Sequence, residues 1–113
     1  MFVDRVDRVD IENIGPLFEN APIFPERTNT EFVRAVNKNM LKMRVWERGN
    51  GETYACGTGA CAAAAAAVEI GLCRRNEPIT VKVRGGDLTV TVTDNGILLT
   101  GDTVRTFGGT VRF

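Results

Sequence analysis

A run of small residues near the middle of this 113-residue chain restricts its fold more than any other feature. Residues 57–67 read G-T-G-A-C-A-A-A-A-A-A, and alanine is the best helix former. With Gly71 in the left-handed position that ends a helix, we expect a helix over 58–70 with Thr58 as its N-cap. This helix has almost no polar face, so it must be buried on most sides, and its small side chains let strands approach closely.

Segments of alternating apolar residues predict a sheet around this helix. We expect strands at 2–6, 30–36, 41–47 and 97–99, a hairpin of 79–84 with 88–93, and a last strand at 110–113. A short helix is expected at 10–18, although Gly15-Pro16 interrupts the pattern. The predicted fold class is α+β, with a mostly antiparallel sheet curled into a barrel-like lobe around one central alanine-rich helix.

Composition excludes several classes of function. Fourteen basic residues balance fourteen acidic ones, which argues against a nucleic-acid or anionic-membrane partner. No apolar stretch approaches the ~20 residues of a membrane span, and no signal segment opens the chain. The chain has three cysteines and no histidine. An odd cysteine count favours a reducing cytoplasm, and the cysteine spacing matches no zinc site, so we expect no metal.

Cys56 is the residue whose surroundings point most clearly to chemistry. It lies where the alanine-rich helix begins, and free N–H groups there stabilise a thiolate or bind a carboxylate. Gly57 and Gly59 let a ligand approach the backbone closely. The same glycines would also suit a helix that merely packs against a strand, and local physics leaves both interpretations open. Cys73 follows the helix, on the order of 20 Å from its start, and cannot share a substrate atom with Cys56.

Three polar residues elsewhere could serve such a site. Arg48 offers a planar fork for a carboxylate, and Glu47 offers an acceptor for an ammonium group, so the pair suits an amino-acid zwitterion. The same pair is also typical of a solvated surface. Asn29 could stabilise a turn or donate to a ligand carboxylate.

Three stretches carry a resemblance to a known family. They read G-P-L-F-E-N-A-P-I-F-P-E-R-T-N-T-E-F-V at 15–33, R-V-W-E-R-G-N-G-E-T-Y-A-C-G-T-G-A-C-A at 44–62 and R-G-G-D-L at 84–88. They resemble the C-terminal half of diaminopimelate epimerase over essentially the whole chain. The resemblance implies a cofactor-independent amino-acid epimerase of lysine biosynthesis, an isomerase that interconverts LL- and meso-diaminopimelate in the cytoplasm.

The resemblance also implies the site residues. In this family, two cysteines face the substrate α-carbon from opposite sides, and one removes a proton while the other returns one. Cys56 matches one of the two. The implied substrate-binding residues are Asn29, Glu47, Arg48, Gly57 and Thr58. Gly57 and Thr58 match positions whose backbone N–H groups hold the reacting carboxylate, and Glu47 matches a position that also supports the catalytic thiols.

The second cysteine of the family lies in an N-terminal lobe with a C-G-N-G-type motif, which this chain does not contain. We therefore expect residues 1–102 to form the C-terminal lobe, with one catalytic cysteine and no activity alone. Residues 103–113 would form a strand that pairs with the missing N-terminal lobe, and a homodimer is a further candidate assembly. Two alternatives stay open, namely another isomerase of this fold, such as a proline racemase-like enzyme, and a non-catalytic half-barrel interaction module.

Overall fold

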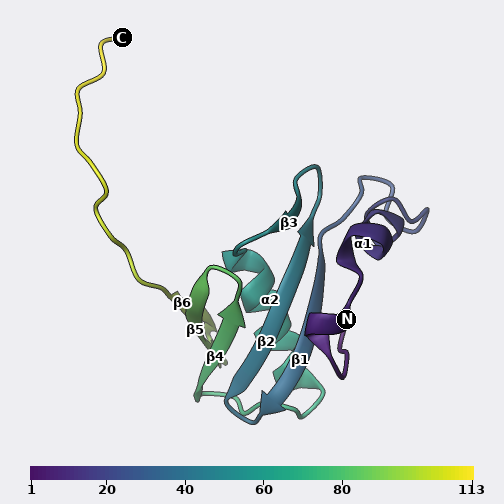
Figure 1. Cartoon of the computed structure of the whole chain (residues 1–113). Coiled ribbons are helices and arrows are strands. Elements are labelled where there is room, and N and C mark those ends of the chain that lie inside the picture. The colour runs from purple at the N-terminus through teal and green to yellow at the C-terminus, as the bar shows by residue number, and fades with distance from the viewer.

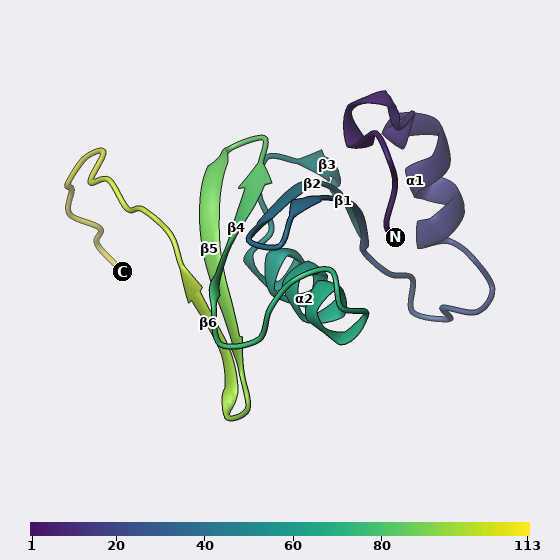
Figure 2. The ribbon, with the colours of Figure 1, turned by 90° about the horizontal axis from the view of Figure 1, so that it is seen from below.

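The computed structural model describes residues 1–113, and helix α2 (Gly57–Glu69) lies in the hollow of a curled sheet (Figures 1 and 2). The other elements are a 3-10 helix at Val6–Arg8, α1 (Ile11–Glu19), β1 (Thr30–Asn37), β2 (Met40–Glu47), β3 (Gly51–Thr53), β4 (Pro78–Val83), β5 (Gly86–Thr93) and β6 (Gly96–Thr100). The α+β class is confirmed, and the sheet is an open, curled layer. Neither helix is long and apolar enough to cross a membrane.

The sheet has six strands in the order β1-β2-β4-β5-β6, with β3 paired to β2. All pairs are antiparallel except β2 with β4, where Leu41 lies opposite Val81. A parallel pair requires a crossover connection, and β3 and α2 provide it between β2 and β4. The crossover therefore carries α2 across the concave face of the sheet.

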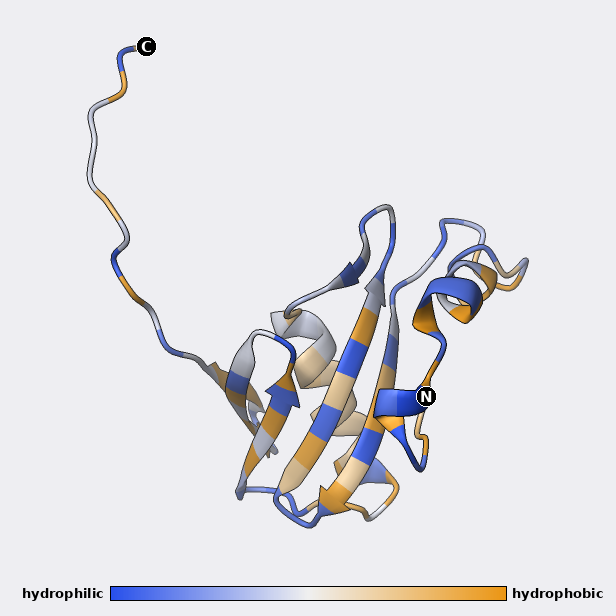
Figure 3. Cartoon of the chain, viewed as in Figure 1, coloured by the Kyte–Doolittle hydropathy of each residue, from blue (hydrophilic) through white to orange (hydrophobic).

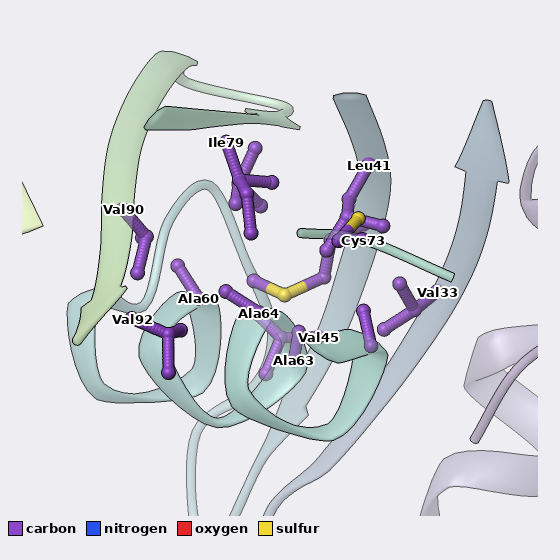
Figure 4. Close-up of a cluster of buried hydrophobic side chains, with 13 residues drawn as sticks. Val33, Leu41, Val45, Ala60, Ala63, Ala64, Cys73, Ile79, Val90 and Val92 are labelled. Atoms are coloured by element: carbon purple, nitrogen blue, oxygen red, sulfur yellow. The ribbon is translucent and has the colours of Figure 1, made fainter. Parts of the chain in front are cut away.

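Strand alternation and the small residues of α2 build the main core. Hydrophobic and hydrophilic residues alternate along β2 (Figure 3). Its side chains Leu41, Met43 and Val45 pack with α2 and with apolar side chains of β1, β4 and β5. Figure 4 shows this cluster, which consists of Val33, Leu41, Met43, Val45, Ala60, Ala63, Ala64, Ala67, Cys73, Ile79, Val81, Val90 and Val92. The four alanines of this cluster are at most 4% exposed, but Ala62 and Ala66 on the other side of α2 are exposed. The prediction that the helix is buried on most sides was therefore wrong, because the open sheet covers only one face of it.

A second, smaller cluster covers the opposite face of β1 and β2. Val6, Ile11 and Phe32 are buried there, and Trp46 packs against them. Gly15 in α1 has no space for a Cβ atom, because the Trp46 ring would collide with it. The glycine therefore allows α1 to lie directly on the indole ring.

Two predictions about local structure, the strands at 2–6 and at 110–113, were wrong. Phe2 makes only an isolated bridge to Val33 in place of a strand at 2–6, because the chain turns into the 3-10 helix. The short helix expected at 10–18 is confirmed as α1, which continues through Pro16 with the loss of only the hydrogen bond that an N–H there would donate to the Glu12 carbonyl. Residues 101–113 form no strand and run away from the sheet with exposed side chains (Figure 1).

One buried carboxylate joins three segments of the fold. The Glu52 side chain is 7% exposed and accepts hydrogen bonds from Arg44, at 2.7 Å from Nε and 3.0 Å from Nη2. Arg84 Nη1 lies 3.0 Å from its second oxygen, and Arg44 also donates to the carbonyls of Val6 and Val9. The Arg44 hydrogen bonds, more than any other factor, hold the pKa of Glu52 below its usual value of 4.5.

We expect Glu52→Gln to lower the free energy of unfolding by about 1–3 kcal/mol at pH 7, because two guanidinium groups lose their carboxylate. Since the folded-state pKa is depressed, this stabilisation is present above the unfolded pKa and is lost as pH falls through the folded one. Urea unfolding at pH 7 and pH 3 measures both effects. The exposed pair Lys82–Asp87 gives the control, and Asp87→Asn should change stability by less than about 0.5 kcal/mol. Equal losses in both variants would contradict the role of Glu52.

Candidate active site

The N-terminus of α2 is capped by the thiol of Cys56. Its Sγ accepts a hydrogen bond from the Gly59 N–H at 3.4 Å and lies 3.4 Å from Thr58 Oγ1. The helix begins at Gly57, so the predicted cap at Thr58 was wrong by two residues. Cysteine serves as the cap because its backbone is extended, with φ −140° and ψ 110°, and its sulfur reaches the free donor of the first turn.

Glu47 ends β2 beside the segment that leads into α2. The Thr53 hydroxyl donates to the Glu47 carboxylate, and Thr53 precedes Cys56 by three residues. Strand β3 also pairs Glu47 with Gly51. The end of β2 and the approach to the thiol are therefore held together by one side-chain bond and a short antiparallel ladder.

Asn29 and Arg48 come from two loops that meet where β1 begins and β2 ends. The Asn29 Oδ1 atom accepts a hydrogen bond from the Arg48 backbone N–H at 2.8 Å. The Arg48 guanidinium donates to the Glu26 carbonyl at 2.9 Å and forms no ion pair with a carboxylate. Its remaining donors are available to a ligand.

An open cleft of about 380 Å³ brings three of the predicted site residues together. Its walls are formed by Arg27, Thr28, Asn29, Glu31, Arg48, Thr58, Gly59 and Ala62. Asn29, Arg48 and Thr58 therefore share one cavity, whereas Cys56, Gly57 and Glu47 do not line it. Thr58 both lines the cleft and contacts the sulfur of Cys56, so the thiol lies beside one end of the cleft.

Glu31 is a residue of this cleft that the sequence analysis did not single out. It faces Val45 across the β1–β2 pair, so it points to the same side of the sheet as Val33 and Glu47. Burial raises the pKa of its carboxyl, and the nearby Glu47 carboxylate raises it further. The alternation of residues 31–33 along the strand could have predicted that Glu31 lies on the helix-facing side of the sheet. It could not have predicted that Glu31 lies beside the first turn of α2.

Glu19 is a second residue that the sequence analysis missed. Its side chain, 8% exposed, accepts hydrogen bonds from Trp46 Nε1 at 2.7 Å, Arg27 Nη1 at 2.8 Å and the Gly49 N–H at 3.0 Å. The Trp46 and Gly49 hydrogen bonds lower its pKa. Arg27 adopts φ +61°, a conformation that non-glycine residues rarely take. One carboxylate therefore joins α1 to both loops that carry Asn29 and Arg48.

The other two cysteines lie in the interior. Cys73 belongs to the main core, and Cys61 is half-buried against it. Burial raises the pKa of both thiols. Neither thiol lines the cleft, and no group of three acidic or thiol side chains is arranged to hold a metal ion.

Comparison with known proteins identifies the family. The sequence profile of diaminopimelate epimerase matches residues 1–106. The chain belongs to the diaminopimelate epimerase family. It is 50% identical over 112 residues to the diaminopimelate epimerase of Synechococcus elongatus and 50% identical over 110 residues to that of Synechocystis. These matches cover 98% and 96% of this chain but 39% of each relative, so the chain spans about two fifths of a curated diaminopimelate epimerase.

A solved structure supports the fold. A phenazine biosynthesis protein of the PhzF family from Bacillus anthracis superposes with a TM-score of 0.59 and 24% sequence identity. The alignment covers 87% of this chain and 32% of that protein. At this identity the likeness concerns the curled sheet and its helix alone.

We expect Cys56 to react with iodoacetamide before Cys61 and Cys73. It accepts an N–H hydrogen bond at the helix N-terminus, whereas the raised pKa of the Cys61 and Cys73 thiols reduces their thiolate fraction. Limited alkylation at pH 8 followed by peptide mapping measures the order. Cys56→Ser provides the control, and equal labelling of the three thiols in the wild type would contradict the expectation.

We expect Glu19→Gln to loosen the two loops at the cleft while the sheet stays folded. The amide keeps one acceptor oxygen, but its NH₂ group meets donors where the carboxylate met them. Amide hydrogen exchange at 27–29 and 48–49 should accelerate relative to β4 and β5. Glu12→Gln, on an exposed position of the same helix, should leave these rates unchanged, and identical behaviour of the two variants would refute the assignment.

Proposed function

We propose that this chain supplies one half of the active site of a cofactor-independent diaminopimelate epimerase. The observation that carries the proposal is the Cys56 thiol, which caps α2 beside a cleft lined by Asn29, Arg48 and Thr58. A thiol, free helix N–H groups and an uncompensated guanidinium are together suited to an amino acid whose α-proton must be removed. The family to which the chain belongs indicates that this amino acid is diaminopimelate.

The reaction needs a base and an acid on opposite faces of the α-carbon. One cysteine thiolate takes the α-proton, and the electron pair of the broken C–H bond passes into the carboxylate to give a planar carbon. A second thiol then delivers its proton to the other face. The N–H groups of Gly57 and Thr58 at the helix N-terminus would stabilise the charge that develops on the carboxylate.

Three side chains would hold the substrate. Arg48 suits a substrate carboxylate, because its guanidinium has donors that no protein carboxylate occupies. Asn29 fixes the Arg48 backbone and retains its amide donors for the same group. Glu47 would accept from a substrate ammonium and, through Thr53, orient the segment that ends in Cys56.

The second thiol would come from an N-terminal lobe. Every residue of β6 is exposed, and a Cβ atom on Gly57 would lie 3.0 Å from Leu99 Cδ2, so this free sheet edge lies beside the start of α2. Residues 103–113 would pair with that lobe, whereas 1–102 form the C-terminal lobe. The exposed apolar side chains that favour this contact are Val104, Phe107, Val111 and Phe113.

The cellular setting follows from the same features. Three free thiols suit the reducing cytoplasm. Where no N-terminal lobe covers it, the same sheet edge with exposed Leu98 offers a surface for pairing with a second copy, and a homodimer is the proposed assembly of the chain by itself.

We expect the 113-residue chain alone not to epimerise diaminopimelate, and we expect activity when the N-terminal three fifths of the Synechococcus elongatus relative is supplied. ¹H NMR in D₂O measures loss of the α-proton signal. Cys56→Ala should reduce the rate in the complemented protein by about 10²–10⁴-fold, because one of the two proton carriers is lost.

Cys61→Ala serves as the matched thiol control and should retain the rate. Rapid inversion by the lone chain, abolished by Cys56→Ala, would disprove the need for a second lobe. A complemented protein that leaves diaminopimelate unchanged would reject the proposed function and favour an interaction module.

A further inference from the structure

The cleft beside Cys56 carries two charged side chains of opposite sign, Arg48 and Glu31, that form no ion pair with another side chain. None of the eight ion pairs of the structure includes Arg48 or Glu31. Arg27, the other cation of the cleft, is already paired with Glu19 at 2.8 Å. Two unpaired charges of opposite sign in one cavity match a zwitterionic group, which carries an ammonium and a carboxylate.

The Glu31 carboxylate lies against the first turn of α2. A Cβ atom on Gly59 would lie 2.7 Å from Glu31 Oε1 and 3.1 Å from Cγ. The absence of a side chain at Gly59 therefore provides the space that this carboxylate occupies. No side-chain donor of the protein bonds to it. The Met1 amino group, whose N–H bonds to the Glu31 carbonyl at 2.7 Å, and the Glu47 carboxylate are the charged groups nearby.

The half-buried Glu31 carboxylate has no cationic side chain as a partner. Burial, the largest factor, and the Glu47 charge raise its pKa, its own backbone N–H and the Met1 amino group lower it, and the net shift is upward. A bound ammonium would reverse this effect, since it supplies the missing positive charge and several N–H donors.

Cys56 and Gly57 do not line the cleft, and Thr58 lies between the Cys56 sulfur and the cleft. A substrate whose reacting carbon lies at the thiol would thus extend its other end into the cleft.

We infer that Glu31 binds the second ammonium group of the substrate, at the end remote from the reacting carbon, while Arg48 binds the carboxylate of that same end. The inference rests on the proposed function and adds a residue that selects diamino over monoamino substrates. A substrate of equal length that lacks the second ammonium would leave Glu31 charged and unpaired in the occupied cleft.

The test compares two ligands of equal length. The ¹⁵N-labelled chain is titrated with meso-diaminopimelate and with 2-aminopimelate, which lacks the second ammonium, and amide shifts of residues 29, 48 and 58 report binding. Wild type should prefer the diamino ligand by about tenfold. Glu31→Gln should reduce this preference to about twofold or less, with 2-aminopimelate binding unchanged. Glu12→Gln, on the exposed face of α1, should keep the wild-type preference.

Gly59→Ala tests the same geometry without changing a charge. Its methyl group would displace the Glu31 carboxylate, and the selectivity should fall as in Glu31→Gln, although alanine is the better helix former. If both variants keep the tenfold preference, the inference is wrong and the proposed function stands. If wild type binds neither ligand, the proposed function fails, and the inference fails with it.

Discussion

Close contact between an alanine-rich helix and a curled sheet is the constraint on which the rest of the structure depends. Ala60, Ala63, Ala64 and Ala67 present almost no side-chain bulk, so the strands of the concave face can approach the α2 backbone (Figure 4). Larger side chains in such a tightly packed interior would force the two layers apart. The same contact fixes the direction of α2 and therefore the place where its free N–H groups emerge.

Two carboxylates with several donors then fix the segments around that helix N-terminus. Glu52 joins β3 to Arg44 of β2 and to Arg84 at the end of β4. Glu19 joins α1 to the two loops that line the cleft. Burial of a carboxylate is unfavourable unless it is paired and hydrogen-bonded, and both groups satisfy this condition with guanidinium or N–H donors. The cleft thus depends on buried polar contacts, whereas α2 depends on apolar packing.

Periodicity predicted the elements that bury one face. Alternation located β1, β2 and the β4–β5 hairpin, and the alanine run located α2, within a few residues. It could not predict that β2 pairs in parallel with β4, because register between distant segments is set by tertiary packing. The cap at Cys56 was missed because sulfur is a weak acceptor that propensity does not favour at this position.

The polar residues of the cleft could not be identified from periodicity. Asn29, Arg48 and Thr58 were identified through a family motif, and the structure brings them to one cavity. Glu19 and Glu31 escaped because their importance lies in neighbours from distant segments, namely Trp46 and Gly49 for Glu19 and Gly59 for Glu31. Without knowledge of the contacts, a single sequence does not distinguish a buried acidic residue on a helix or strand from a solvent-exposed one.

The placement of the thiol relative to the cleft explains why such a site would be divided between two lobes. A helix N-terminus presents its N–H groups in one direction, so one lobe can approach only one face of a substrate carbon. The cleft, formed by β1, two loops and the first turns of α2, would bind the substrate through its remote end and leave the opposite face of the reacting carbon open. Since β6 and its exposed edge lie beside the start of α2, a second lobe that extends the sheet there would reach that open face. Under the proposed function, recognition and the first proton carrier would therefore belong to one folding unit, whereas inversion would require the second.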